Sequence, residues 1–399
     1  MRLRTPFAFL VCGGTILTGC DVDGRAGIPD SSEPIAQTAA PIKGGYPDNT
    51  DTAVVGMVDD MGGGAFGLCS GSLLAPNMVL TARHCVSVTA DKAFACDADG
   101  NLIGGGTQVG ADHPPAKIAV YVGNQRPNFQ AGTAVANARG TKIFHDDSKT
   151  LCNHDLALVL LDTSIDGALI APLRMDTPPA DKEEFTAIGW GVTDVDPYPD
   201  IRQQRTGIKI RHVGRYPGDG ITEPVPQNEF IVGESICSGD SGGPAMAAST
   251  NAILGVVSRG GNGTNDPNDP AAGCLGAGNF YTRVDGFRDI IEAAYAEAGQ
   301  DPWYEGQPDP RLAKFGATCG TDADCRSNAC LPSNGTCSQD CSTDACPSGY
   351  ICTTVDTRKL CAPAVSTSSG CSTSGAGGNW SGLALAVFGL FALKRRKRS

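Results

Sequence analysis

Short apolar runs recur along the chain between residues 42 and 298. The clearest are AVVGMV, NMVLTA, KIAVYVG, LALVLL and AILGVVS, and glycine, proline, asparagine and aspartate separate them. Many short, β-branched runs bounded by turn residues are typical of a β-sandwich or β-barrel. We therefore predict one large all-β domain over 42–298.

In one segment the apolar residues repeat with the spacing of a helix rather than occurring in short runs. In DGFRDIIEAAYAEAG the apolar residues Phe287, Ile290, Ile291 and Ala294 follow helical spacing, and Gly299 is suited to ending a helix. This pattern predicts a helix that closes the domain.

The N-terminus is predicted to direct export. Residues 1–20 begin with two arginines, continue into an apolar run and end in LTGC, which resembles the lipobox of bacterial lipoproteins. The resemblance implies that Cys20 is acylated. The alternative is a plain secretory signal with a chance cysteine. Residues 21–41 are polar and contain proline, as expected of a pro-segment or linker.

The C-terminus carries a second targeting pattern. Residues 362–379 form a Ser/Gly linker, and residues 380–399 hold Trp380, an apolar run and a basic cluster. The layout resembles the MYXO-CTERM sorting tail of myxobacterial surface proteins. It implies that Cys371 is processed by a sorting enzyme and that the protein is exported to the cell envelope or surface of a Gram-negative bacterium. An ordinary membrane anchor is the alternative.

Charge and cysteine content agree with export. The formal net charge is −12, and positive residues cluster at both ends, so the acidic body should not bind nucleic acid. Apart from Cys12, Cys20 and Cys371, fourteen of the 17 cysteines remain, an even number that indicates disulfides in an exported chain. Eight of them crowd into residues 319–361, after a linker at 299–318, and predict a small disulfide-rich module. A zinc site is the competing interpretation of these eight.

Three stretches carry candidate catalytic chemistry. ICSGDSGGPAM places Ser241 among glycines, where a turn can expose a nucleophile beside backbone N–H donors. LTARHCV supplies His84 as a candidate base, and NHDLALVLLD supplies Asp155 as a carboxylate that could orient the base.

These stretches occur in the order LTARHC, DLAL and CSGDSGGP, and IGWG, VVSRGG and FYTRV follow the same family order. The chain thereby resembles chymotrypsin-like (trypsin-like) serine peptidases. The resemblance implies two packed six-stranded antiparallel β-barrels with a C-terminal helix. It makes Ser241 the nucleophile, His84 the general base and then acid, and Asp155 the orienting carboxylate. The backbone N–H groups of Gly239 and Ser241 would form the oxyanion hole.

The resemblance also implies structural pairs. Cys69–Cys85 would hold the histidine loop and Cys237–Cys274 the serine loop, which leaves Cys96 to pair with Cys152. Cleavage before Ile42 would free an ammonium group to pair with Asp240, as in a zymogen. Because Pro41 precedes that bond, an activating peptidase of another specificity would be required.

The same resemblance predicts part of the substrate preference. The three positions of the specificity pocket are Ser235, Gly260 and Asn279, and they predict a small or medium neutral residue before the scissile bond rather than Arg or Lys. Arg259, where an aromatic residue is usual, could favour acidic residues further upstream. The loop GNGTNDPNDPAAG is expected to be solvated, with calcium binding as the alternative.

Two functions follow. The first is a surface-anchored serine endopeptidase that acts on proteins or peptides and needs no cofactor or metal. The second is a catalytically silent relative that serves as a surface binding or adhesion protein. Arg83 stands where the family nearly always has alanine, and we expect its side chain to reach solvent or an acidic neighbour.

Overall fold

The computed structural model describes residues 45–364, except 51–52, 63–64, 91–93, 128–133, 192–198, 265, 267–268 and 270. The predicted signal with Cys20, the pro-segment, Ile42 and the tail with Cys371 lie outside the described residues. Among the residues that are described, no helix is both long and apolar enough to span a membrane.

The first half of the body is a closed antiparallel barrel. Its strands pair in the order β2-β3-β4-β9-β8-β7 and close through β7 and β2. Every residue of β9 is buried, because the strand lies between the barrel interior and the rest of the body. The strands are β2 (Val54–Gly62), β3 (Ala65–Ala75), β4 (Met78–Thr81), β7 (Ile118–Tyr121), β8 (Ala138–Phe144) and β9 (Ala157–Leu161).

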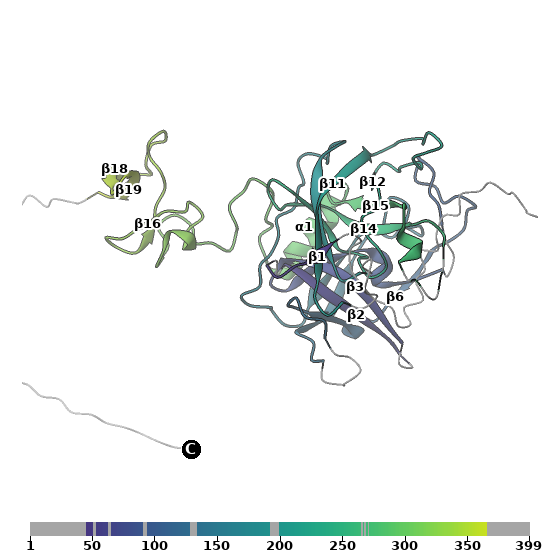
Figure 1. Ribbon diagram of the computed structural model, residues 1–399. Helices are drawn as coiled ribbons and strands as arrows, with labels where there is room; N and C mark the ends of the chain where they lie inside the picture. Colours follow the sequence, from purple (N-terminus) through teal and green to yellow (C-terminus); the bar gives the residue numbers. More distant parts are fainter. Residues whose placement is uncertain are drawn as a thin grey trace, which may run out of the picture.

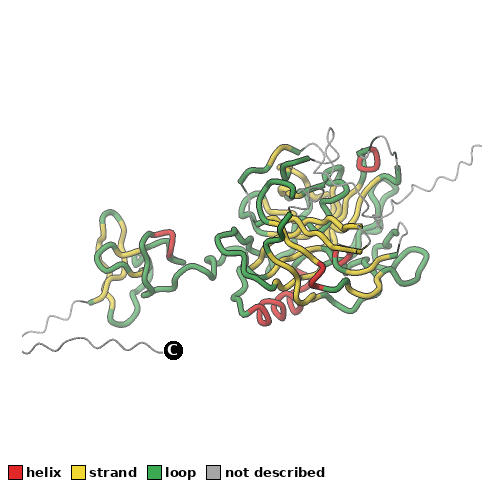
Figure 2. Tube along the Cα trace, turned by 90° about the horizontal axis from the view of Figure 1, so that it is seen from below, coloured by secondary structure: helices red, strands yellow, loops and turns green. Residues whose placement is uncertain are grey.

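The second half is another barrel of the same kind. Its six strands pair in the order β11-β10-β13-β14-β15-β12, and β12 closes on β11. The expected pair of six-stranded antiparallel barrels is therefore confirmed (Figures 1 and 2). The strands are β10 (Glu184–Gly189), β11 (Gln203–Val213), β12 (Glu229–Val232), β13 (Pro244–Ala247), β14 (Ile253–Gly261) and β15 (Gly278–Arg283).

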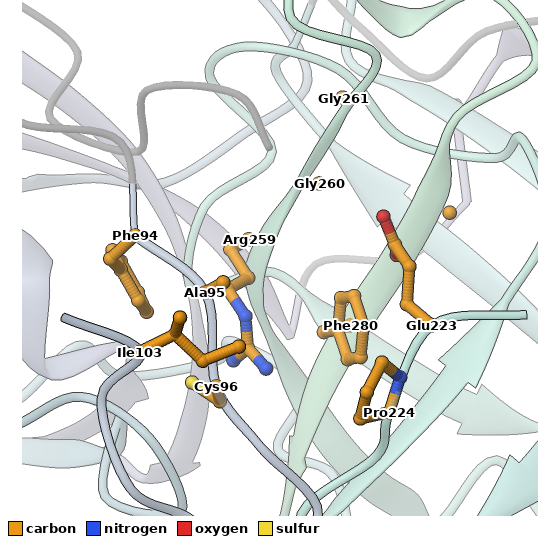
Figure 3. Close-up of a pocket in the computed structure, with 11 residues that line it drawn as sticks. Phe94, Ala95, Cys96, Ile103, Glu223, Pro224, Arg259, Gly260, Gly261 and Phe280 are labelled. Atoms are coloured by element: carbon orange, nitrogen blue, oxygen red, sulfur yellow. The ribbon is translucent and has the colours of Figure 1, made fainter. Parts of the chain in front are cut away.

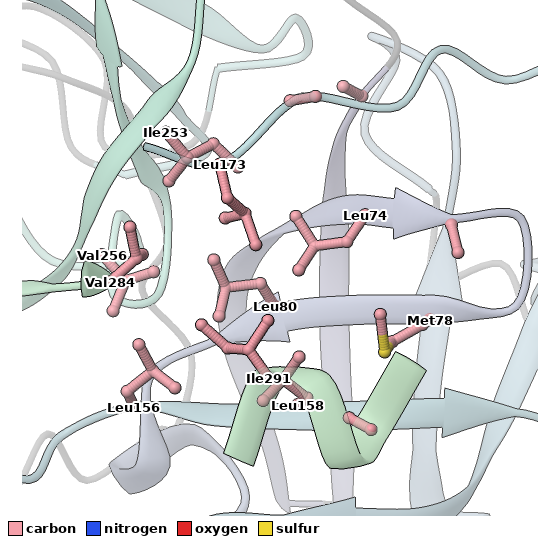
Figure 4. Packing of buried hydrophobic residues seen from close by; sticks show 14 of the residues in the cluster. Leu74, Met78, Leu80, Leu156, Leu158, Leu173, Ile253, Val256, Val284 and Ile291 are labelled. Atoms are coloured by element: carbon pink, nitrogen blue, oxygen red, sulfur yellow. The ribbon is translucent and has the colours of Figure 1, made fainter. Parts of the chain in front are cut away.

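The predicted helix is also confirmed. Helix α1 (Arg288–Ala298) ends at Gly299, whose φ of 66° is the left-handed conformation that glycine adopts without strain. Its buried face packs on a core that both barrels share (Figure 4). That core includes Leu74, Leu80 and Leu158 of the first barrel and Ile253 and Val256 of the second. The interface between the barrels is thus a continuous apolar core.

Smaller elements complete the body. A two-stranded sheet of β5 (Ser87–Thr89) and β6 (Val109–Asp112) lies near the loop after β4. The expected linker at 299–318 begins as part of the body, since Leu173 exchanges backbone hydrogen bonds with Trp303 and Glu305. Short 3-10 turns are η1 (Arg83–Cys85), η2 (Pro115–Lys117), η3 (Ala272–Cys274), η4 (Asp285–Phe287) and η5 (Asp322–Asp324).

The cysteine-rich module lies apart from the body and consists of two small hairpins (Figure 1). They are formed by β16 (Cys330–Leu331) with β17 (Thr336–Cys337) and by β18 (Tyr350–Val355) with β19 (Arg358–Pro363). All eight of its cysteines are in disulfides rather than in a zinc site. The pairs are Cys319–Cys330, Cys325–Cys337, Cys341–Cys352 and Cys346–Cys361.

The start of the described chain is anchored in the second barrel. Strand β1 (Tyr46–Pro47) pairs with β11, and the next residue, Asp48, forms a buried ion pair with Arg202. The Arg202 Nε and Nη2 atoms lie 2.9 and 2.8 Å from Asp48 Oδ2, and both side chains are at most 1% exposed.

We expect Asp48→Ala to lower the free energy of unfolding by about 3–5 kcal/mol, because it leaves the Arg202 guanidinium buried without a counter-charge. Urea unfolding with the disulfides intact measures the change. Glu184→Ala is the control, since its ion pair with Lys209 is largely exposed and should contribute less than about 1 kcal/mol. Equal losses in the two variants would contradict the expectation.

Candidate active site

His84 lies on the short turn η1, directly after β4. The disulfide Cys69–Cys85 fixes this turn to β3. The ring Nδ1 of His84 is 2.8 Å from Asp155 Oδ2, and the backbone N–H of His84 donates to Asp155 Oδ1 at 2.9 Å. Both carboxylate oxygens therefore bind the same residue, which orients the ring and leaves its Nε2 directed away from Asp155.

Asp155 precedes β9 and is completely buried. Its Oδ2 also accepts a hydrogen bond of 2.7 Å from the hydroxyl of Ser258 on β14. Burial raises the pKa of Asp155, but the charge of His84 and the hydrogen bonds from His84 and Ser258 outweigh it, so the pKa lies below its usual value. Asp155 is consequently ionised at neutral pH. The role of Ser258 was not recognised in the sequence, although the residue lies in the VVSRGG stretch.

Ser241 lies on the tight turn that precedes β13. Its carbonyl accepts the N–H of Ser70 at 2.8 Å. The next residue, Gly242, has φ of 75°, and a Cβ there would lie 2.1 Å from Thr81 Oγ1 and 2.8 Å from the Ala82 nitrogen. Only glycine fits so close to the segment that leads into His84. The structure thus places the turn of Ser241 against the segment that carries His84.

Gly239 belongs to the same turn, with φ of 95°. Its carbonyl accepts a hydrogen bond from Ser70 Oγ at 3.1 Å. Within the described part of the chain, neither the N–H of Gly239 nor that of Ser241 donates to another residue. These two donors remain available to an oxygen atom of a ligand.

Asp240, which lies between Gly239 and Ser241 in the sequence, has a buried side chain. It is 1% exposed, and its carboxylate accepts the N–H groups of Gly191 at 2.8 Å and Cys237 at 3.0 Å. The partner implied for it, Ile42, lies outside the described residues.

The six cysteines of the body are paired as the resemblance and the remaining cysteines implied. The disulfides are Cys69–Cys85, Cys96–Cys152 and Cys237–Cys274. The last of these connects the turn before Ser241 with η3.

Two of the three residues expected to form the specificity pocket lie side by side. Asn279 of β15 pairs with Gly260 of β14, and its amide nitrogen donates to the Gly233 carbonyl at 3.0 Å. A Cβ on Gly260 would lie 1.9 Å from Asn279 Oδ1, so this amide fills the space beside Gly260. Ser235 is completely buried and carries no charge.

Arg259 does not reach toward solvent. Its Nη2 is 2.5 Å from Oε2 of the buried Glu229, and its guanidinium lies 4.2 Å from the centre of the Phe280 ring. Figure 3 shows the side chain between Phe94 and Phe280, in the wall of a pocket also lined by Pro224. Because Glu229 neutralises the charge, the structure argues against the expectation that Arg259 selects acidic residues of a substrate.

The remaining histidines also have acidic partners. His113 lies 2.5 Å from Asp59, His145 2.9 Å from Asp112, His154 2.5 Å from Asp146 and His212 3.6 Å from Asp181. Arg83 is 1% exposed, so of the two expected alternatives it reaches an acidic neighbour and not solvent. Its Nη1 is 3.3 Å from Asp146 Oδ1 and donates to the Ser148 carbonyl at 2.7 Å.

Sequence comparison with known proteins identifies one family. The family model described as trypsin matches residues 42–291. A trypsin of Phaedon cochleariae is 24% identical over 242 residues, which are 56% of this chain and 77% of the relative. The cercarial protease of Schistosoma mansoni is 27% identical over 205 residues, which are 48% of this chain and 70% of the relative. A solved structure, the scabies mite inactivated protease paralogue S-I1, covers 63% of this chain and 99% of its own at 18% identity and a TM-score of 0.43.

Proposed function

The chain belongs to the trypsin family of serine peptidases. We propose that it is an active endopeptidase with Ser241, His84 and Asp155 as its catalytic triad. The observation that carries the proposal is the pair of contacts between His84 and a buried, ionised Asp155, with the turn of Ser241 packed against the same segment.

The proposed reaction follows from these contacts. Asp155 accepts the Nδ1–H of His84, so Nε2 is unprotonated and can take the proton of the Ser241 hydroxyl as its oxygen attacks the peptide carbonyl. The N–H groups of Gly239 and Ser241 stabilise the oxyanion. Protonated His84 then donates its proton to the leaving amine, and an acyl-enzyme forms. Water attacks the ester with His84 again as base, which releases the acid and restores Ser241.

Active-site labelling tests this proposal. We expect a fluorophosphonate probe to label the purified native protein and to leave the heat-denatured protein unlabelled, because only the folded site activates the serine. N-terminal sequencing of the labelled band identifies the processed form. A chain that begins at Ile42 but takes no label would favour the silent, surface-binding relative instead.

Activation is proposed to use Ile42 and Asp240. Strand β1 pairs with β11, which also pairs with β10, and Gly191 beyond β10 donates to Asp240. The four steps along the chain from Ile42 to Tyr46 can span about 13 Å, more than two strand spacings of about 4.8 Å. A new N-terminus at Ile42 could therefore reach Asp240 after cleavage by an activating peptidase. Labelled protein beginning at another residue would argue against this activation step.

Substrate preference is proposed to be for a small neutral residue before the scissile bond, because Asn279 fills the space beside Gly260. We expect Asn279→Gly to raise kcat/KM at least tenfold for peptides with Phe or Leu at that position, relative to Ala. Asn251→Gly is the matched control, since Asn251 has φ of 57° in a distant turn where glycine is tolerated. An unchanged Phe-to-Ala ratio, or a preference for Arg or Lys, would contradict the proposal.

The place of action is proposed to be the cell surface. The seven disulfides suit an oxidising compartment, and the lipobox-like Cys20 and the sorting tail with Cys371 supply two candidate anchors. Cleavage before Ile42 would detach the body from the N-terminal lipid and leave the tail as its anchor, or release the enzyme if the tail is also removed.

A further inference from the structure

The residues that precede His84 and Asp155 in the sequence both contact the side chain of Asp146. Arg83 immediately precedes His84, and His154 immediately precedes Asp155. Both contact Asp146, which follows β8. Asp146 Oδ1 is 3.3 Å from Arg83 Nη1, and its Oδ2 is 2.5 Å from His154 Nδ1. One carboxylate therefore joins the two segments through the residues that precede His84 and Asp155.

We propose that Asp146 is a positioning residue, which keeps His84 and Asp155 in place by holding Arg83 and His154. This inference rests on the proposed triad. Asp146 itself is fixed, because its Oδ1 also accepts the N–H of Ser148 at 3.2 Å, and the Ser148 carbonyl binds Arg83. The loop after β8 thus holds Arg83 through two acceptors.

The two disulfides closest in sequence to His84 and Asp155 do not link the segments that carry these residues. Cys69–Cys85 ties η1 to β3, and Cys96–Cys152 ties the segment before Asp155 to an earlier loop. Neither joins the histidine segment to the aspartate segment. The pairing of Thr81 on β4 with Ala157 on β9 joins the adjoining strands. The Asp146 carboxylate adds a link between Arg83 and His154, and it suits this position because a buried guanidinium requires a counter-charge.

The carboxylate is essential to this arrangement. An amide at position 146 could accept from only one of the two neighbours, and it would leave Arg83 with the Ser148 carbonyl as its remaining acceptor. Movement of Arg83 would shift His84, which follows it on a three-residue turn. Displacements of about 1 Å in a catalytic group can lower rates a hundredfold.

The first test compares Asp146→Asn with Asp181→Asn in enzyme whose active sites have been counted with the fluorophosphonate probe. Asp181 is the matched control, because it also binds a histidine and a backbone N–H, those of His212 and Val213, in the second barrel. For a short peptide ester we expect Asp146→Asn to lower kcat about tenfold with KM unchanged, and Asp181→Asn to change neither. Equal kcat values in the two variants would overturn the proposal.

The pH profile separates positioning from a loss of stability. Without Asp146, Arg83 loses the carboxylate that it contacts. Its charge then acts more strongly on the adjacent His84, and like charge disfavours protonation of the ring. We expect the acid limb of kcat/KM to move to lower pH in Asp146→Asn and to return when Arg83→Ala is added. If Asp146 contributed only to stability, Asp146→Asn would lower Tm and leave the acid limb of the kcat/KM profile unchanged. Among the described residues, the charged or titratable groups near His84 and its chain neighbours are Arg83, Asp112, His145, Asp146, His154 and Asp155.

A milder variant keeps the proposal testable if Asp146→Asn fails to fold. His154→Ala removes the contact between His154, whose side chain is 36% exposed, and Asp146. The variant leaves Arg83 paired with Asp146. We expect kcat to fall about threefold with Tm unchanged, and an unchanged kcat would overturn the proposal. If the wild-type enzyme takes no label, the triad fails; if it is labelled and these variants match it, only the role of Asp146 fails.

Discussion

Replacement of Ser241 by alanine is expected to lower kcat by about a million-fold and to abolish labelling by the fluorophosphonate probe. The variant loses the hydroxyl that the proposed His84–Asp155 pair would activate, while the turn itself is held by backbone contacts from Ser70 and Gly242 that alanine preserves. The protein should therefore fold normally and bind peptides.

The measurement is hydrolysis of a peptide ester by the wild type and the variant after identical processing at the N-terminus. Ser249→Ala is the control, because Ser249 is exposed in the turn between β13 and β14 and should leave kcat unchanged. Residual activity above about one part in a thousand would indicate a different nucleophile.

Replacement of Asp155 by asparagine is expected to lower kcat about ten-thousand-fold near pH 7, with KM little changed. Asp155 accepts three hydrogen bonds, from the backbone and ring of His84 and from Ser258. An amide has one acceptor atom, so it cannot satisfy these donors. The ring would adopt the tautomer with its proton on Nε2, which cannot accept the proton of Ser241.

Steady-state kinetics with Asp166→Asn as the control measures this effect, since Asp166 is an exposed aspartate in the turn after β9. A rise in KM with kcat preserved would show that Asp155 acts in binding rather than in orienting the base.

Local patterns in the chain predicted the all-β class and the final helix, whereas the two six-stranded barrels were implied by the family resemblance. The apolar runs became barrel strands, and the helical spacing of Phe287 to Ala294 became α1 with Gly299 as its end. The triad order came from motifs that short sequence stretches preserve. Each of these features depends on neighbours in the chain or on a recognisable family pattern.

Contacts between distant side chains could not be predicted in this way. Arg259 was expected at the substrate, but its partner Glu229 lies 30 residues earlier in no recognisable motif. Arg83 and Asp146 are 63 residues apart, and Ser258 reaches Asp155 across 103 residues. The direction in which a long side chain points depends on which charge the fold brings near it, and no local pattern encodes that charge.

The attachment of β1 to β11 constrains the order in which this chain can fold. Residues 46–48 are synthesised long before their partners at 202–204. They can therefore take their final place only after β11 is available for pairing. If the bond before Ile42 is the activation site, as proposed, cleavage that requires an ordered β1 would come after β11 has joined the second barrel.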